Sequence, residues 1–172
     1  YELVYETAKG KIDNIRFKDG DYGEQILITL KSEDENEEPV TISLATNQPF
    51  GEDFMKKLPN IKLDKDVIFR PFNFEDETGK NRRGLAITQE ENGEQVKVDN
   101  YYYDKETKEA TNGYPKPAGD EKTSDDWRVY FINARKFLIA ETKKRLETSF
   151  SFPEKPTEEV KGGEIQVEDI PF

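Results

Sequence analysis

The feature that most constrains this chain is a change in hydrophobic period near its fiftieth residue. Before that point, apolar residues recur at every second position, as they do in the half-buried strands of an antiparallel sheet. Phe50, Phe54 and Leu58 then recur at every fourth position, which indicates a helix, and Pro59 ends that helix. Strand-like alternation returns afterwards. One short helix between two groups of strands indicates a small mixed sheet or barrel.

Five segments have the pattern of strands, and they are residues 7–18, 24–31, 40–45, 66–74 and 84–89. Asn92-Gly93 predicts a tight hairpin turn, after which residues 95–99 extend the pairing. Three strands, a helix and two strands is the order of the OB-fold, a five-stranded and partly open barrel. We therefore expect a mainly β protein, with a five-stranded OB-type barrel and a long Tyr-rich loop in residues 1–122.

A second helix is expected in residues 123–149, packed on the barrel or on a partner subunit. Thr123 and Asp126 have the spacing of a capping box at its start. An apolar stripe runs along this helix and consists of Trp127, Tyr130, Phe131, Ala134, Phe137 and Leu138. Residues 150–172 lack periodicity and carry several prolines, so we expect them to form a flexible acidic tail.

Composition excludes several classes of function. The chain has no cysteine and no histidine, which excludes disulfides, thiolate or imidazole metal sites, and Ser-His-Asp or Cys-His catalysis. The formal net charge of −11 argues against a nucleic-acid partner unless basic residues gather locally. No apolar run approaches the length of a membrane span, and no signal-peptide pattern is present. We expect a cytoplasmic, non-enzymatic protein without a metal or cofactor.

The last residues of the sequence form the most informative motif, which consists of Glu168, Asp169, Ile170, Pro171 and Phe172. Two acids precede an apolar pair and a terminal aromatic residue, and the proline keeps this end extended. Such an end can place its apolar side chains in a pocket of a partner while a basic group takes the carboxylate. The acids steer the tail towards basic partners. An ordinary solvated terminus is the alternative.

At these residues the chain resembles the single-stranded DNA-binding protein family of bacteria and their phages. Bacterial members typically end in acids followed by Ile-Pro-Phe, and some phage members keep only the acidic stretch and the terminal Phe. The long Tyr-rich loop and the second helix depart from the bacterial pattern, so a phage-type member is the better match.

This resemblance implies binding of single-stranded DNA without sequence specificity, in a bacterial cell or a phage-infected host. It implies that the tail docks replication, recombination or repair proteins, such as a helicase, polymerase, primase or nuclease. It also implies that the tail can compete with DNA for the groove. A homo-oligomer is compatible with this reading.

Strand 66–74 supplies the first candidate DNA-binding residues. Arg70, Phe72 and Phe74 share one face of this strand, and Val67 and Phe69 share the other. We expect the first set to face outwards, because aromatic rings stack on bases and a guanidinium pairs with phosphate. The opposite facing, with Phe72 and Phe74 in the core, is the alternative.

Further candidates surround this strand. Lys80, Arg82 and Arg83 lie between the fourth and fifth strands, a connection that OB-folds use for oligonucleotides. Four more residues are expected to extend or flank the groove, and they are Lys11, Arg16, Lys18 and Tyr22. Tyr102, in the Tyr-rich loop, is expected either to stack on a base or to cover the barrel end. The alternative for each cation is a turn or strand that is polar because it is solvated.

Three hypotheses of function follow. The leading one is a sequence-independent binder of single-stranded DNA that also recruits proteins. The second is a protein–protein adaptor in which the barrel is a scaffold and the tail attracts replication enzymes, which the acidic composition favours. The third is a carboxylate-dependent nuclease, which needs a metal cluster that the sequence does not show.

Overall fold

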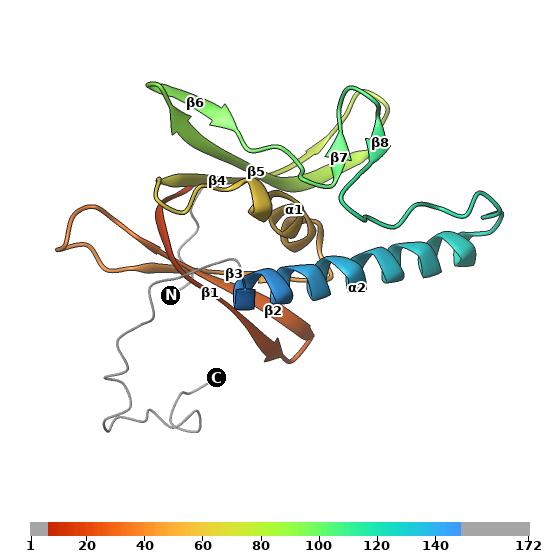
Figure 1. Ribbon diagram of the computed structural model, residues 1–172, viewed down its shortest axis with the longest axis horizontal. Helices are drawn as coiled ribbons and strands as arrows, with labels where there is room; N and C mark the ends of the chain where they lie inside the picture. Colours follow the sequence, from red (N-terminus) through yellow and green to blue (C-terminus); the bar gives the residue numbers. More distant parts are fainter. Residues whose placement is uncertain (1–6, 149–172) are drawn as a thin grey trace.

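The computed structural model describes residues 7–148, which form an antiparallel sheet with two helices (Figure 1). The strands of the main sheet are β1 (Ala8–Gly20), β2 (Gly23–Lys31), β3 (Val40–Ala45), β4 (Val67–Glu75), β5 (Asn81–Glu91) and β6 (Glu94–Lys97). The helices are α1 (Pro49–Lys57), followed by the short 3₁₀ turn η1 (Leu58–Asn60), and α2 (Ser124–Thr148). A two-stranded hairpin lies in the Tyr-rich loop and consists of β7 (Tyr103–Asp104) and β8 (Glu109–Ala110).

The six strands pair in the order β3-β2-β1-β4-β5-β6, and the sheet is not closed into a barrel. The mainly β class and the short helix between the third and fourth strands are confirmed, whereas the five-stranded OB-type barrel is not. The sixth strand arises because Asn92 and Gly93, with φ of 52° and 84°, form the predicted tight turn and return the chain along β5.

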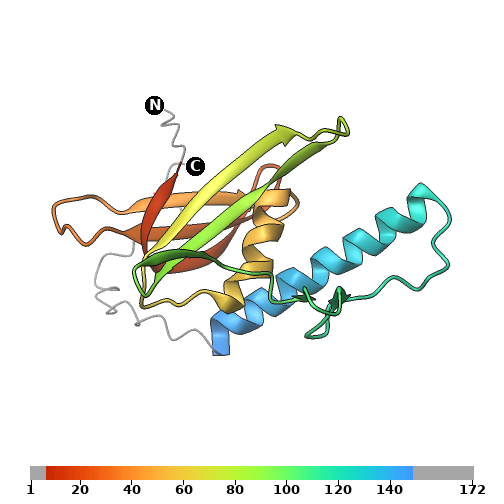
Figure 2. The same ribbon diagram turned by 90° about the horizontal axis from the view of Figure 1, so that it is seen from above.

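β1 joins the two halves of the sheet. Its first residues, Ala8 to Gly10, pair with β4, and the residues from Lys11 onwards pair with β2. Gly10 stands at the change of partner, where a Cβ atom would lie 2.7 Å from the carbonyl oxygen of Lys31. A side chain at this position would therefore collide with backbone. The bend lets the two halves face each other with α1 between them (Figures 1 and 2).

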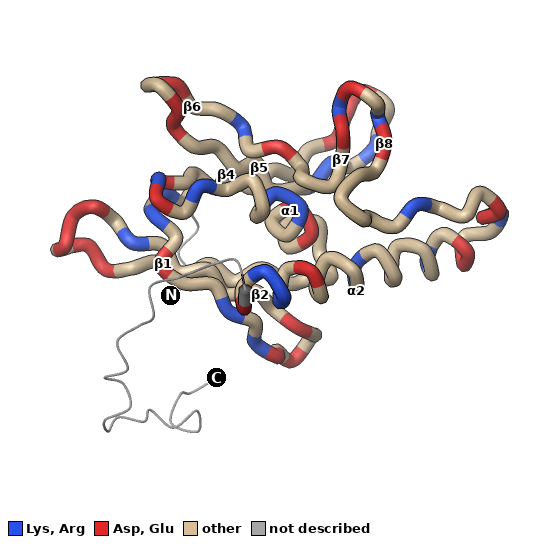
Figure 3. The backbone as a smooth tube through the Cα atoms, in the orientation of Figure 1, with Lys and Arg blue, Asp and Glu red and all other residues tan. Residues whose placement is uncertain are grey.

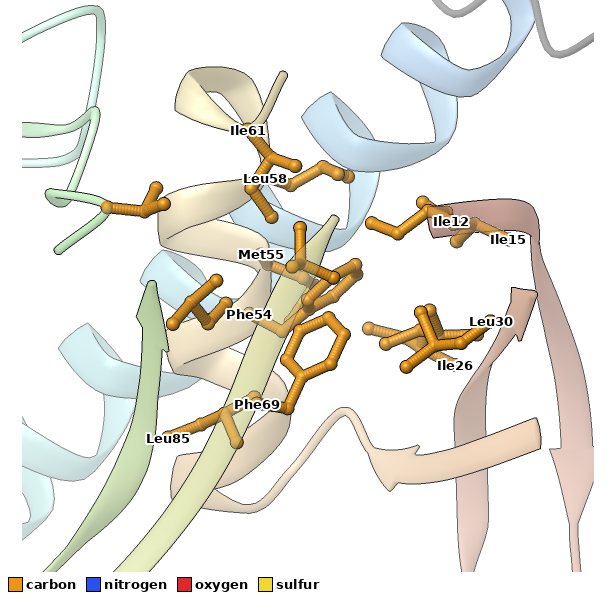
Figure 4. Packing of buried hydrophobic residues seen from close by; sticks show 14 of the residues in the cluster. Ile12, Ile15, Ile26, Leu30, Phe54, Met55, Leu58, Ile61, Phe69 and Leu85 are labelled. Carbon is orange, nitrogen blue, oxygen red and sulfur yellow. The ribbon is translucent and has the colours of Figure 1, made fainter. Parts of the chain in front are cut away.

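The core fills the space between these halves and α1 (Figure 4). The predicted alternation in β2 is confirmed, because Ile26, Ile28 and Leu30 are buried on one face. From α1, Phe54 packs against Phe69 of β4 with ring centroids 6.0 Å apart. The helical spacing recognised in the sequence thus places one face of α1 in the core.

β6 pairs only with residues 88–91 of β5, so the same edge of β5 has no strand partner before residue 88. Side chains of α1 cover this part of the edge. The backbone N–H of Leu85 donates to Asp53 Oδ2 at 2.8 Å, and Lys57 Nζ donates to the Leu85 carbonyl at 2.5 Å. Burial lowers the pKa of Lys57. A Cβ atom on Gly84 would lie 2.3 Å from Asp53 Oδ2, so the absence of a side chain lets the helix approach this closely.

α2 begins with the predicted capping box. Thr123 Oγ1 accepts from the Asp126 N–H at 3.2 Å, and Asp126 Oδ2 accepts from the Thr123 N–H at 2.9 Å. The C-terminal half of α2 packs on the rest of the protein, where Leu138 is buried. Its N-terminal half extends past the sheet (Figures 1 and 2).

Candidate nucleic-acid interface

The outer face of β4 carries the predicted aromatic residues. Val67 and Phe69 are 0 % and 2 % exposed and face the core, whereas Phe74 is 55 % exposed on the opposite face. The predicted facing of this strand is therefore confirmed, and the alternative is wrong. The rings of Phe72 and Phe74 lie side by side, with centroids 5.9 Å apart and planes inclined by 41°.

Small residues on β5 accommodate these rings. Phe72 pairs with Gly84, and Arg70 pairs with Ala86, so no bulky side chain of β5 competes for the space beside Phe72. A Cβ atom on Gly84 would lie 2.6 Å from the Phe72 ring, which shows that this ring lies over the glycine. The backbone of β5 thus forms the floor on which Phe72 rests, and Phe74 stands beside it.

The same face is richer in cations than the chain as a whole. Besides Arg70 and Arg82, the strand register places Lys9 opposite Ile68, and Lys97 opposite Thr88, on this face. Against these four cations stand three carboxylates: those of Glu90 on β5, of Asp76 in the β4–β5 turn, and of Asp53, whose Oδ2 lies where a Cβ atom on Gly84 would point. Many acids of the chain lie in the loop between β2 and β3 (Figure 3), where Glu33 and Glu37 line a pocket together with Lys9.

Asp76 organises the turn between β4 and β5. Its Oδ1 accepts from the Thr78 hydroxyl at 2.5 Å and from the Lys80 N–H at 3.0 Å, and Arg82 Nε donates to its Oδ2 at 2.8 Å. These bonds, that of the Thr78 hydroxyl first, hold the pKa of Asp76 well below its ordinary value. The ion pair holds Arg82 beside Phe74, which is its partner in the strand register. Asp76 neutralises part of the positive charge of Arg82.

The predicted basic residues of this turn do not all lie together. Arg82 is opposite Phe74 and shares its face, whereas Arg83 is opposite Asn73 and points to the other side of the strand. Lys80 lies in the turn itself, one residue before β5. The expected cluster of Lys80, Arg82 and Arg83 is thus split by the strand alternation, and Arg82 is its member on the aromatic face.

The candidates on β1 form a second, separate surface. Lys11, Arg16 and Lys18 lie beyond the last residue of β1 that pairs with β4, on the outer face of β1 and β2. Tyr22, in the turn between β1 and β2, is 93 % exposed. Most neighbouring positions on this face are polar, as in the hydrogen bond of 3.2 Å between Thr29 and Thr41, and Leu27, the partner of Arg16, is an exception. This surface can contact phosphates, and Tyr22 is its projecting aromatic ring.

Tyr102 requires a correction. The side chain predicted to stack on a base or to cover the barrel end is only 3 % exposed. Its ring contacts those of Tyr101, Tyr114 and Phe137 at centroid distances of 5.1, 5.9 and 5.7 Å, and burial raises its pKa. It therefore covers one end of the core and offers no face to a base. Tyr103, at 45 % exposure, is the most exposed tyrosine of this loop.

Two features of the structure were missed from the sequence. Lys97 was not predicted because its strand, β6, was expected only as an extension of the pairing. The open sheet also leaves an apolar cavity of about 640 Å³ between β3 and β4, lined mainly by Val40, Ile42, Leu44, Phe50, Phe69, Pro71 and Leu85. Only the strand order reveals this cavity, because it occupies the place where a barrel would close. Its lining lacks the cations that a phosphate backbone needs.

Residues 7–148 contain no group of three or more acidic side chains placed to hold a metal ion. None of their helices combines the length and the apolar character that a membrane crossing requires. The predicted partner-binding residues, 168–172, lie outside the described residues. Comparisons of the chain with protein-family models, with curated proteins and with solved structures give no match.

Proposed function

We propose that this protein binds single-stranded DNA without sequence preference through the outer face of β4 and β5. The observation that carries the proposal is the pair of neighbouring rings, Phe72 and Phe74, set between Arg70 and Arg82 on a face opposite the core. Phe74 is exposed and its ring lies beside that of Phe72, so the two form one aromatic surface on this face. Aromatic faces beside guanidinium groups are the elements that single-strand binders combine.

The mechanism follows from this arrangement. Successive bases stack on Phe72 and Phe74, and the phosphates between them pair with Arg70, Arg82, Lys9 and Lys97. Every base has an aromatic face, so the contact does not depend on sequence. A duplex hides those faces, which makes the single strand the preferred ligand. Affinity falls with salt, because each paired phosphate releases bound cations.

An OB-type relationship is part of the proposal. The element order β1-β2-β3-α1-β4-β5, with β1 shared between the two halves of the sheet, is supporting evidence. In that reading, the polar outer face of β1 and β2, with Arg16, Lys18 and Tyr22, continues the path of the strand beyond β4. The protein would then act as a coating protein in the cytoplasm of a bacterial or phage-infected cell.

The acidic and apolar segment 168–172 is proposed to recruit replication or recombination proteins, as the resemblance to single-stranded DNA-binding proteins implies. Deleting residues 164–172 should leave DNA binding intact or strengthen it, because the deletion removes three acids. Weaker DNA binding after this deletion would contradict the role of the segment as a recruiting element separate from the DNA-binding face.

The experiment that tests the proposal measures fluorescence anisotropy of a labelled 30-mer, as a single strand and as a duplex, at low and at moderate salt. We expect the single strand to bind more tightly at both, and its affinity to fall as salt rises. Equal affinity for the duplex would show a purely electrostatic contact. Absence of binding to the single strand at low salt would reject the function.

A protein–protein adaptor is the second candidate. The net charge of −11 and the apolar cavity between β3 and β4 favour it over a general nucleic-acid binder. An adaptor would show no anisotropy change with the 30-mer at low salt. It would still lose its protein partners when residues 164–172 are deleted.

A further inference from the structure

One edge of β4 is paired along only part of its length. Ala8 of β1 lies opposite Phe69, and the pairing between these two strands stops there. Within residues 7–148, no strand pairs with residues 70–75 of β4 on this side, whereas β5 pairs with β4 along its whole length on the other. Six residues of β4 therefore present an open edge directly beyond the point where β1 begins.

The hydrogen bonds of β5 show which backbone groups of β4 point to this open edge. The Leu85 N–H donates to Asp53 Oδ2 at 2.8 Å, and the Leu85 carbonyl accepts from a lysine of α1 at 2.5 Å. Both groups thus point away from β4, so the opposite residue, Pro71, points its own backbone away from β5. By the two-residue period of a strand, the N–H and C=O groups of Asn73 and Glu75 also point to the open edge.

The chain itself supplies a strand for this edge. Residues 1–6, here named the N-terminal segment, read Tyr-Glu-Leu-Val-Tyr-Glu and lie outside the described residues. Tyrosine and valine are residue types enriched in strands. Six extended residues span about 20 Å, which is the length of the six open residues of β4. Because the segment continues directly into a strand that is already paired with β4, no loop has to be closed to pair it.

We propose that the N-terminal segment continues β1 along the open edge of β4, in the register that Ala8 sets. Counting back from Ala8 places Tyr5 opposite Phe72 and Leu3 opposite Phe74. The backbone of Phe72 bonds to β5, so Tyr5 and Phe72 form a pair without mutual hydrogen bonds, the kind in which side chains lie closest. Cross-strand pairs of an aromatic residue with another aromatic or an aliphatic residue stabilise antiparallel sheets.

The other face of the N-terminal segment suits the same register. Val4 comes opposite Asn73 and Glu6 opposite Pro71, and both of these β4 residues are exposed. The Glu6 carboxylate therefore stays in water, where its charge has no burial cost. A shift by one residue would exchange the two faces and place Val4 and a glutamate beside the two phenylalanines of β4. The alternation of residues 1–6 thus favours the unshifted register.

This strand adds a further aromatic residue to the candidate interface. β4 lies between β5 and the N-terminal segment, so Phe72 has Gly84 on one side and Tyr5 on the other. A tyrosine ring stacks on a base as a phenylalanine ring does. This role of Tyr5 rests on the proposed binding of single-stranded DNA, whereas the strand itself does not.

Amide hydrogen exchange of the full chain, followed by NMR, tests the strand. We expect the N–H groups of Asn73 and Glu75 to be protected, and to exchange about tenfold faster or more when residues 1–6 are deleted. The N–H groups of Phe72 and Phe74, which bond to β5, should keep their rates. Rapid exchange of Asn73 and Glu75 in the wild type, or protection that survives the deletion, would overturn the proposal.

Other occupants of the open edge would give different results. Protection of Asn73 and Glu75 that disappears on dilution would indicate a strand from a second copy of the chain. Protection that is lost when residues 164–172 are deleted would indicate the C-terminal segment. Either result would overturn the proposal.

A single substitution tests the register without removing the segment. Val4→Pro deletes the N–H that the proposed register pairs with the Asn73 carbonyl, so exchange at Asn73 should become faster. The matched control Val4→Thr keeps both the N–H and the branched side chain, and should leave exchange at Asn73 unchanged. Equal exchange rates at Asn73 in the two variants would reject this register.

Fluorescence anisotropy with the labelled single-stranded 30-mer tests the role of Tyr5. Tyr5→Ala should weaken binding by about fivefold or more through the loss of one stacking contact, whereas Val4→Thr, on the other face, should bind as the wild type does. If the wild type binds and Tyr5→Ala binds within twofold of it, the role of Tyr5 is wrong while the proposed function stands. A wild type that binds no single strand would reject both, and hydrogen exchange still decides whether the strand forms.

Discussion

Replacement of Phe74 by alanine is the sharpest perturbation of the candidate interface. Phe74 is the more exposed ring of the pair, since 55 % of it is open to solvent while Phe72 rests over Gly84. Stacking of one base on one aromatic side chain contributes about 1–3 kcal/mol. Phe74→Ala should therefore weaken binding of a single-stranded 30-mer by roughly 5- to 150-fold at constant salt.

The substitution removes no charge, so the slope of log affinity against log salt should stay that of the wild type. The assay is fluorescence anisotropy at three salt concentrations, with Tyr103→Ala as the control, because Tyr103 is comparably exposed outside this face. The reasoning would be refuted if Phe74→Ala bound within twofold of the wild type, or if Tyr103→Ala lost as much affinity.

Four further predictions follow from the same structure. Arg70→Gln should lower the salt slope by about 0.7, the value for one phosphate contact with a single strand, in the same titrations. Asp53→Ala leaves the Leu85 N–H without its acceptor and should lower the free energy of unfolding by about 1–3 kcal/mol in urea titrations, whereas an unchanged midpoint would show that α1 does not cover this edge. Leu138→Ala should cost about 2–5 kcal/mol in the same assay, since its side chain is buried where α2 packs. Burial raises the pKa of Tyr114 to about 12, so stability that is complete below about pH 10 should be lost as pH rises towards 12, and less steeply in Tyr114→Phe.

Local signals in the sequence predict much of this fold. The alternation of Ile26, Ile28 and Leu30 identifies a buried strand face, because side chains of a strand point to opposite sides in turn. Asn92-Gly93 identifies a hairpin, since both residues accept positive φ. The spacing of Thr123 and Asp126 identifies the start of α2, where each side chain bonds the backbone of the other.

The features that the sequence did not predict share one cause. Each depends on contacts between residues that are far apart in the sequence. Whether the sheet closes depends on pairing between strands far apart in the chain, and no local period encodes it. Three consecutive tyrosines give no indication that Tyr102 is buried while Tyr103 is exposed, because the docking of Phe137 decides this. The stripe of α2 was recognised, but its pattern could not show that the half with Trp127 lies beyond the core.

The candidate site was predicted in outline. The outward facing of Phe72 and Phe74 follows from the alternation of side chains along β4, in which Val67 and Phe69 face the core. The ion pair between Asp76 and Arg82 was not foreseen, since it depends on the geometry of the β4–β5 turn. Separation of the cations on β1 from those on β4 results from the bend at Gly10, which a linear pattern does not reveal.

The most direct test of the central claim is photo-crosslinking of the full chain to a single-stranded oligonucleotide that carries bromodeoxyuridine, followed by mapping of the modified peptide. Our account predicts crosslinks to Phe72 or Phe74, and their loss in the Phe72→Ala/Phe74→Ala double variant. Crosslinks confined to Trp127 and Phe131 of α2, or an equal yield from the double variant, would contradict the claim that the outer face of β4 and β5 binds the strand.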